Sequence, residues 1–110
     1  MKETLLVKHA VGGRTFIDSE KDGVSYQWEQ AGEETRFVLS VPSGVQVEEI
    51  MKWKDELNVF LFQEQEGQPI KKIWFYVKDG PVAYDAASGQ LTILAQSKIE
   101  YIPDQFSAQL

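Results

Sequence analysis

Short segments in which apolar and polar residues alternate recur along the whole chain, and turn residues separate them at a spacing of roughly ten residues. The pair Gly12-Gly13 can take the positive φ angles of a tight hairpin, and Ala31-Gly32-Glu33-Glu34 marks a second one. Regular turn signals of this kind favour an antiparallel sandwich or barrel over a fold in which strands and helices alternate. The pattern therefore predicts an all-β chain.

Nine strands are expected, at residues 4–7, 14–17, 24–28, 35–41, 49–54, 57–63, 70–78, 90–95 and 98–102. Their alternating apolar residues predict one common core, formed by Phe37, Leu39, Val41, Leu57, Val59, Leu61, Leu91 and Ile93. Residues 47–57 also fit a helix, because Val47, Ile50 and Met51 have helical spacing. Since Met51 and Trp53 alternate with lysines, the strand is the preferred interpretation.

Two of the expected strands are apolar on both faces. The strand at 57–63 carries Phe60 and Phe62 on the side away from the core, and the strand at 70–78 carries Trp74 and Tyr76 there. A sandwich strand needs only one buried face, so this second apolar surface requires a cover. The cover is either part of the chain itself, such as the N-terminal hairpin or the wall of a closed barrel, or another subunit or client protein.

Length and composition predict a single globular domain in a reducing compartment. The chain has 110 residues, 43% of them hydrophobic, and no cysteine, so neither a disulfide nor a thiolate metal site is expected. The N-terminus has no signal-peptide pattern, because a charge returns after three apolar residues, and no apolar run is long enough to span a bilayer. We therefore expect a cytoplasmic protein without membrane contact.

The charge argues against a nucleic-acid partner. Net charge is −6 and the isoelectric point is near 4.7, so a phosphate backbone would be repelled on average. The basic pairs Lys52 with Lys54 and Lys71 with Lys72 are interpreted as solvated strand edges that discourage edge pairing. The same negative charge suits contact with a basic protein surface.

No residue pattern predicts catalysis, a metal or a cofactor. His9 is the one histidine in the sequence, and no cysteine or second histidine accompanies it to form a zinc site. The serines have no motif that places a base beside them, and the carboxylates of Asp18, Glu20 and Asp22 do not form a calcium loop. Gly12-Gly13 is not followed by the helix or lysine of a phosphate loop. We expect no enzyme activity.

Several short motifs, taken in their order along the chain, resemble a known superfamily. The opening Tyr26-x-Trp28-x-Gln30 resembles the start of the CS domain, the β-sandwich of co-chaperones. Later motifs resemble the related alpha-crystallin domain of small heat-shock proteins, namely Val41-Pro42-Ser43-Gly44-Val45, Glu48-Glu49-Ile50, Leu57-Asn58-Val59 and Gly89-Gln90-Leu91-Thr92-Ile93. The resemblance covers about residues 26–95 and implies an antiparallel β-sandwich of the CS/alpha-crystallin type. It also implies binding of client proteins.

The chain departs from this family pattern at several places. Lys52 and Lys54 stand where the family usually has apolar residues, and Tyr84 stands at a usual alanine. No Ile-x-Ile tail follows the last expected strand, so a monomer or dimer is expected rather than a large shell. The division we expect is an extra N-terminal hairpin at 1–23, a sandwich core at 24–96, and a C-terminal strand and tail at 97–110.

Two main functional hypotheses remain from the sequence. The first is a chaperone-like or co-chaperone module that binds a protein partner through large aromatic side chains, which often dominate interface energies. The candidate binding residues are Trp28, Trp53, Phe60, Phe62, Trp74 and Tyr76. The second is a small acidic inhibitor or immunity-type protein with one basic partner. A small β-barrel that encloses an apolar ligand is a further alternative.

Overall fold

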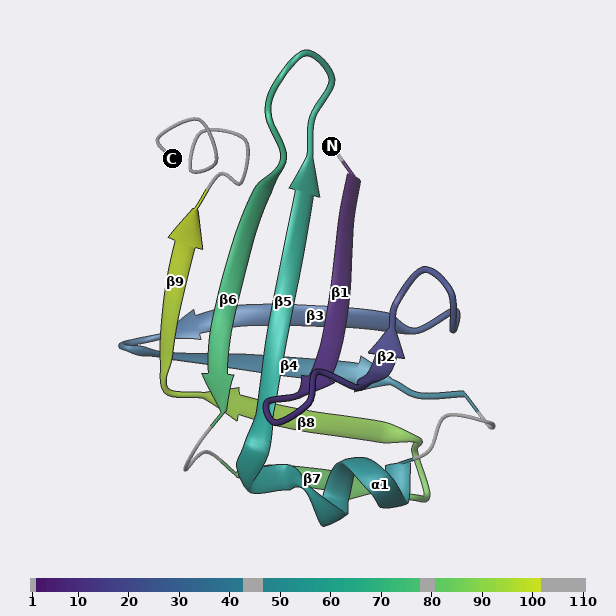
Figure 1. The fold of residues 1–110 in the computed structure, drawn as a ribbon. Coiled ribbons are helices and arrows are strands. Elements are labelled where there is room, and N and C mark those ends of the chain that lie inside the picture. Colours follow the sequence, from purple (N-terminus) through teal and green to yellow (C-terminus); the bar gives the residue numbers. More distant parts are fainter. Residues whose placement is uncertain (1, 43–46, 78–80, 102–110) are drawn as a thin grey trace.

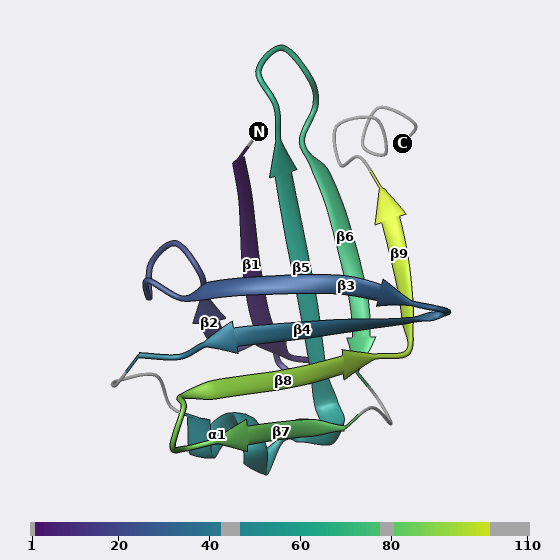
Figure 2. The ribbon, with the colours of Figure 1, turned by 180° about the vertical axis from the view of Figure 1, so that it is seen from behind.

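Two antiparallel β-sheets lie face to face, and their strands run across one another rather than along one another (Figure 1). This computed structural model describes residues 2–42, 47–77 and 81–101. The view from behind in Figure 2 shows the smaller sheet lying over the lower half of the larger one. The prediction of an all-β sandwich is confirmed.

The larger sheet has five strands in the order β2-β1-β5-β6-β9. The bounds are Lys2–His9 for β1, Thr15–Asp18 for β2, Leu57–Glu64 for β5, Lys71–Val77 for β6 and Ser97–Tyr101 for β9. All neighbouring pairs in it are antiparallel. The expected strand ends at Lys78 and Ile102 lie outside the described residues.

The smaller sheet has four strands in the order β3-β4-β8-β7. The bounds are Ser25–Ala31 for β3, Glu34–Ser40 for β4, Val82–Asp85 for β7 and Gln90–Ala95 for β8. Strand β7 was not among the expected strands, because only Val82 in it is buried and its apolar pattern is short. Hydrogen bonding to β8 and burial of Val82 decide its conformation.

The N-terminal hairpin is built into the larger sheet. Gly12 and Gly13 have φ angles of 86° and 74°, which side chains other than glycine rarely adopt, and they turn the chain as predicted. Strand β1 then pairs with β5 along its whole length, and Leu5, Val7 and Ile17 are fully buried between the sheets. The hairpin therefore lies beside β5 and does not cover the outer aromatic side chains of that strand.

The core lies between the two sheets, where alternate residues of each strand are buried. The predicted core residues are all buried except Val41, which is partly buried and packs against the others. Phe37 and Phe75 meet edge to face at the centre, with ring centroids 4.8 Å apart. Period-two alternation thus identified the inward side of each main strand correctly.

The prediction of a strand at residues 49–54 is wrong, because the chain is helical there. The chain forms α1 at Val47–Lys52 and a 3₁₀ turn, η1, at Lys54–Glu56. Ile50 is fully buried and Met51 packs against the core, so the helical spacing prevails over the alternation with the lysines. Acidic residues in the first turn and Lys52 in the last suit the helix dipole. Within the described ranges, no helix is long and apolar enough to cross a membrane.

Residues 43–45 of the expected Pro-Gly corner lie outside the described residues. Elsewhere the observed strand bounds differ from the expected ones by a few residues at most, and β8 begins and ends as predicted. In Figure 2 the upper ends of β1, β5 and β6 extend beyond β3. Each sheet also has an outer face, which is turned away from the core.

Candidate functional site

Figure 1 views the five-stranded sheet from its outer side, and no other described element lies in front of it. The strand registers place Leu6 beside Phe60, Phe60 beside Trp74, and Trp74 beside Ile99. Because residues directly opposite one another point to the same side of a sheet, these four form one apolar row across β1, β5, β6 and β9. Ile99 is 47% exposed, and the other three are half-buried.

Two neighbouring rows flank this apolar row on the same side of the sheet. Thr4, Phe62 and Lys72 form one of them, and Lys8, Asn58, Tyr76 and Ser97 form the other. We call the surface made by Leu6, Phe60, Phe62, Trp74, Tyr76 and Ile99 the outer aromatic face. Its aromatic members are not part of the buried core or of the residues packed against it.

The aromatic rings of this face stack on one another. Phe60 and Trp74 have ring centroids 5.8 Å apart at an interplanar angle of 25°, and Trp74 and Tyr76 are 4.7 Å apart at 29°. Offset stacking at these distances contributes roughly 0.5–1.5 kcal/mol per pair beyond the area buried. The stack holds the three rings in one arrangement, so the face is organised before any partner binds.

Two lysines lie over the stack from opposite flanking rows. The Lys72 ammonium is 4.7 Å from the ring centroid of Phe60 and 5.4 Å from that of Phe62. The Lys8 ammonium is 5.8 Å from the same Phe60 ring. These distances are typical of cation–π contacts. In a chain of net charge −6, two ammonium groups thus lie against the aromatic rings of this face.

The carboxylates on this side of the sheet lie at its margins. Glu64 is the last residue of β5, and Asp18 ends the edge strand β2 beside Leu6. The Asp18 carboxylate accepts hydrogen bonds from the backbone N–H groups of Glu20 and Lys21 at 3.0 and 3.1 Å. The negative charge of Asp18 is thus partly satisfied within its own turn.

Trp74 carries an unsatisfied donor at the centre of the face. Its indole Nε1–H is buried and has no hydrogen-bond acceptor within the described part of the chain. A buried indole N–H usually finds a partner, and leaving such a group unpaired costs roughly 1–3 kcal/mol.

A shallow depression of about 200 Å³ adjoins the aromatic face at the start of β5. It is lined by Ala10, Asp55, Glu56, Leu57, Asn58, Tyr76 and Val77. Tyr76 belongs to both the depression and the face, and Asn58, its partner across β5 and β6, also lines the depression. The depression therefore extends the face toward η1.

Trp28, a predicted binding residue, lies elsewhere and points between the sheets. Its ring centroid is 6.2 Å from that of the buried Phe75. Its Nε1–H donates to Glu3 Oε1 at 3.2 Å, and the Tyr26 hydroxyl donates to the same oxygen at 2.8 Å. The Gln63 amide donates to Glu3 Oε2 at 2.8 Å. Trp28 is thus part of a cross-sheet hydrogen-bond network.

This network perturbs one titratable group. Burial, followed by the hydrogen bond to Glu3 and the charge of that residue, raises the pKa of the Tyr26 phenol above its ordinary value. The protonated hydroxyl is therefore the donor in this contact across a wide pH range. Because its phenol is held protonated, Tyr26 serves as a fixed donor rather than as a base.

Trp53 lies at a third place, between α1 and η1. Its ring centroid is 4.8 Å from that of His9, and the Lys52 ammonium is 5.1 Å from the Trp53 ring. His9 Nε2 is 3.5 Å from Glu56 Oε2. The predicted binding residues therefore divide into three groups, and the structure brings together Phe60, Phe62, Trp74 and Tyr76 alone.

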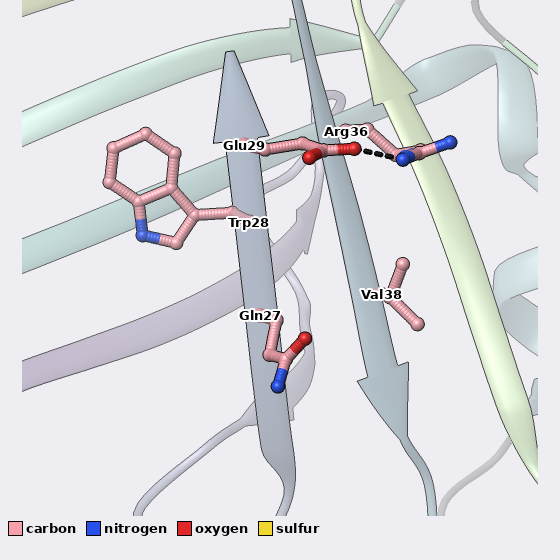
Figure 3. Close-up of a pocket in the computed structure, with 5 residues that line it drawn as sticks. All are labelled: Gln27, Trp28, Glu29, Arg36 and Val38. Atoms are coloured by element: carbon pink, nitrogen blue, oxygen red, sulfur yellow. Dashed lines mark hydrogen bonds and ion pairs between the residues drawn. The ribbon is translucent and has the colours of Figure 1, made fainter.

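The outer face of the four-stranded sheet is mainly polar. Figure 3 shows a shallow depression of about 180 Å³ there, in which Glu29 reaches toward Arg36 and forms an ion pair with it. The indole of Trp28 extends past β3 on the side away from Val38. Glu29 and Arg36 neutralise one another, and the neighbouring residues have no arrangement of nucleophile and base. This depression has no catalytic geometry.

Metal-binding geometry is not found in the described ranges. No group of three or more histidine, cysteine, aspartate or glutamate side chains lies close enough there to hold an ion. The pair formed by His9 and Glu56 has no third ligand of these types among those residues. Among the described residues, the best-organised surface is therefore the outer aromatic face. It consists of packed aromatic side chains flanked by lysines.

Sequence reasoning missed two members of the outer aromatic face and the two lysines beside it. Leu6 and Ile99 complete the apolar row, and Lys8 and Lys72 lie over its aromatic rings. The double-sided apolarity of Leu5-Leu6-Val7 was a signal for Leu6. No such pattern marked Ile99, because its neighbours Lys98 and Glu100 are charged. It joins the apolar row only because β9 pairs with β6, which the sequence does not reveal.

Comparison of the chain with protein-family models, with curated proteins and with solved structures found no match.

Proposed function

We propose that this protein is a chaperone-like or co-chaperone module without catalytic activity, and that it binds a protein partner through the outer aromatic face. In this proposal it acts in the cytoplasm as a monomer or dimer. The observation that carries the proposal is the apolar row Leu6–Phe60–Trp74–Ile99, which crosses four strands on a side of the sheet that no described element covers.

Leaving such a surface in water costs free energy. Contiguous exposed apolar side chains are unfavourable, and where they are rimmed by polar residues they often mark protein contacts. Here the polar rim consists of Thr4, Asn58 and Ser97 together with the two lysines. Trp and Tyr are also the residue types that most often dominate interface energies.

The resemblance to CS and alpha-crystallin domains points in the same direction. Proteins of those families hold other proteins on a β-sandwich, and the present chain offers a pre-organised aromatic surface on one sheet of such a sandwich. Membership in that superfamily is part of the proposal. The aromatic face supports the binding function independently of the family, since its chemistry suits protein contact in any scaffold.

The proposal is tested by capturing partners from a native lysate with three forms of the protein. Wild type is compared with the double variant Phe60→Ser, Trp74→Ser and with Val38→Ser. Val38 is a half-buried residue on the outer face of the other sheet, so it controls for a nonspecific effect of placing a serine on a sheet surface. Urea unfolding of each form shows that the captured differences come from folded protein.

We expect the double variant to lose the proteins that wild type retains and Val38→Ser to keep them. Each lost aromatic anchor should weaken binding by about 1 kcal/mol or more. Equal capture by wild type and by a folded double variant would contradict the proposal, because the aromatic face would then have no part in binding.

A further inference from the structure

We infer that the side of β3 that faces away from β4, which we call the open edge, binds an extended segment of another protein as an added antiparallel strand. The bound segment has small β-branched side chains, such as threonine, on the side turned toward the core. This site is separate from the outer aromatic face and goes beyond the proposed function. It is carried by the backbone hydrogen bonds of the smaller sheet and by the side chains that hold β3 in place.

Alternate backbone groups of β3 point away from β4. In an antiparallel sheet, successive residues of a strand bond to opposite neighbouring strands. The Val41 N–H, directly after β4, donates to Gly89 O at 2.9 Å, so the odd-numbered residues of β4 bond to β8 and the even-numbered ones bond to β3. The even-numbered residues of β4 are paired with odd-numbered residues of β3. The backbone N–H and C=O groups of Tyr26, Trp28 and Gln30 therefore face the open edge.

No described strand occupies the open edge. Strand β3 is the first strand of the smaller sheet, and β4 is its one neighbour among the described strands. Just before β3, the Val24 N–H points the same way and donates to Ser19 O at 3.1 Å. From Tyr26 to Gln30 no described backbone group takes the corresponding place. Three donors and three acceptors are thus offered to an added strand.

The other edge strands of the two described sheets have features that discourage pairing with another chain. Strands β2 and β7 have four residues each, and the pairing of β1 with β2 is irregular. Strand β9 pairs Lys98 with Phe75 and Glu100 with Ile73, so its two charges are on the side of buried residues. Short strands, irregular pairing and inward charges protect sheet edges. Strand β3 has seven residues and neither lysine nor proline, so it lacks these protections.

The residues that face the open edge are held in an extended form by their own side chains. The Tyr26 hydroxyl and the Trp28 indole N–H both donate to Glu3, at 2.8 and 3.2 Å. The Thr35 hydroxyl donates to Gln30 Oε1 at 3.0 Å. Binding costs less conformational entropy when the receiving strand is already fixed. The open edge is therefore pre-organised for an added strand.

The inward side chains of the bound segment would meet an aromatic ring and a polar row. Figure 3 shows the indole of Trp28 extending past β3 toward the open edge. The strand registers place Glu3, Gln63 and Lys71 in one row of the larger sheet, on the side that faces the smaller sheet. Threonine offers a methyl group to the ring and a hydroxyl group to the polar row, and its β-branched form suits a strand.

A second copy of the chain does not fit the open edge. Two copies joined through antiparallel β3 strands are related by a two-fold axis perpendicular to the joined sheet, so both larger sheets lie on the same side of it. The upper ends of β1, β5 and β6 extend beyond β3 (Figure 2), and in such a pair they would enter the space of the other copy. A single extended segment meets no such obstacle.

The inference is tested with the full-length protein and peptides of about nine residues, long enough to cover β3. The parent peptide alternates threonine and serine. One derivative is N-methylated at the threonines and the other at the serines, so the two differ only in which backbone N–H groups are blocked. Amide hydrogen exchange and the indole N–H resonances, both followed by NMR, give the site and the affinity.

In the protein alone, the amides of Tyr26, Trp28 and Gln30 should exchange quickly, and those of Gln27 and Glu29 should exchange slowly because they bond to β4. At a free concentration of about ten times Kd, the parent peptide should slow the first three amides about tenfold. The N-methylthreonine peptide should bind about tenfold more weakly than the N-methylserine peptide, because inward residues turn their N–H groups to β3.

A pair of variants tests one donor of the open edge. Gln30→Pro removes the backbone N–H, whereas Gln30→Ala keeps it, and both lose the side-chain bond to Thr35. Gln30→Pro should bind the parent peptide about two- to tenfold more weakly than Gln30→Ala. Urea unfolding shows that each variant is folded. The double variant Phe60→Ser, Trp74→Ser should bind the peptide as wild type does, so the two binding sites are tested separately.

Four results would overturn the inference. Slow exchange of the Tyr26, Trp28 and Gln30 amides in the protein alone would show that the open edge is already covered. Equal affinity of the two methylated peptides would exclude strand addition. A shift of the Trp74 indole resonance without one of Trp28 would assign the peptide to the outer aromatic face. Protection of the edge amides that rises with protein concentration alone would identify a second copy as the occupant.

Discussion

Glu3 and Tyr26 lie 23 positions apart in the chain, and the Tyr26 hydroxyl donates a hydrogen bond of 2.8 Å to the Glu3 carboxylate across the space between the two sheets. Glu3 belongs to β1 of the larger sheet, and Tyr26 belongs to β3 of the smaller one. The same carboxylate accepts from Trp28 and Gln63. One side chain thus joins the sheets at the end where the apolar core stops.

The Tyr26 hydroxyl should make stability decrease at alkaline pH. Burial and Glu3 raise the pKa of this phenol above the unfolded value of about 10, so above that pH the unfolded chain loses a proton that the folded chain still holds. The stabilisation from this group is therefore complete below pH 10 and is lost as pH rises toward the folded pKa. Tyr26→Phe should be less stable than wild type at pH 8, and the difference should narrow between pH 10 and 11. Urea unfolding at each pH measures this, and a difference independent of pH would contradict it.

Removing the Glu3 carboxylate should lower the free energy of unfolding by about 1–3 kcal/mol. Glu3→Ala leaves the donors of Tyr26, Trp28 and Gln63 without their acceptor, and unpaired half-buried donors are costly. Glu3→Gln keeps one carbonyl oxygen for Tyr26 and Trp28 and should lose less. Urea unfolding at pH 7 compares the two variants. A Glu3→Ala variant as stable as wild type would show that the network contributes nothing to stability.

Trp74 and Phe75 should respond differently to truncation although they are adjacent in the chain. Phe75 is fully buried between the sheets, and Phe75→Ala should lower the free energy of unfolding by about 3–5 kcal/mol. Trp74 is on the outer face and stacks on Phe60 and Tyr76, so Trp74→Ala should cost about 1–2 kcal/mol. Chemical unfolding of both variants gives the two values. A larger loss for Trp74→Ala than for Phe75→Ala would contradict the assignment of the two faces.

Ile50 should be the one residue of α1 whose truncation strongly destabilises the protein. Its side chain is fully buried, and Ile50→Ala should lower the free energy of unfolding by about 2–5 kcal/mol. The exposed Glu48 in the same helix serves as the control, and Glu48→Ala should change stability by no more than about 0.5 kcal/mol. A similarly small loss in the free energy of unfolding for both variants would show that α1 does not contribute to the core through Ile50.

The double-sided apolarity of β5 and β6 predicted the aromatic half of the candidate site. Phe60, Phe62, Trp74 and Tyr76 do share one outer surface, because both strands alternate with period two and are neighbours in the sheet. The predicted residues Trp28 and Trp53 do not join them. An aromatic side chain alone does not indicate which sheet it belongs to or which side it takes, so their placement could not be derived.

Sequence alone was sufficient for the all-β class, the hairpin at Gly12-Gly13 and the inward residues of the main strands, because turn chemistry and alternation are local properties. The helix at 47–52 required the tertiary structure, since a six-residue segment fits both periods and the burial of Ile50 selects between them. The outer aromatic face required it as well. Leu6 lies beside Phe60 and Ile99 beside Trp74 only because β1 and β9 pair with β5 and β6, and such pairing depends on the packing of the whole chain.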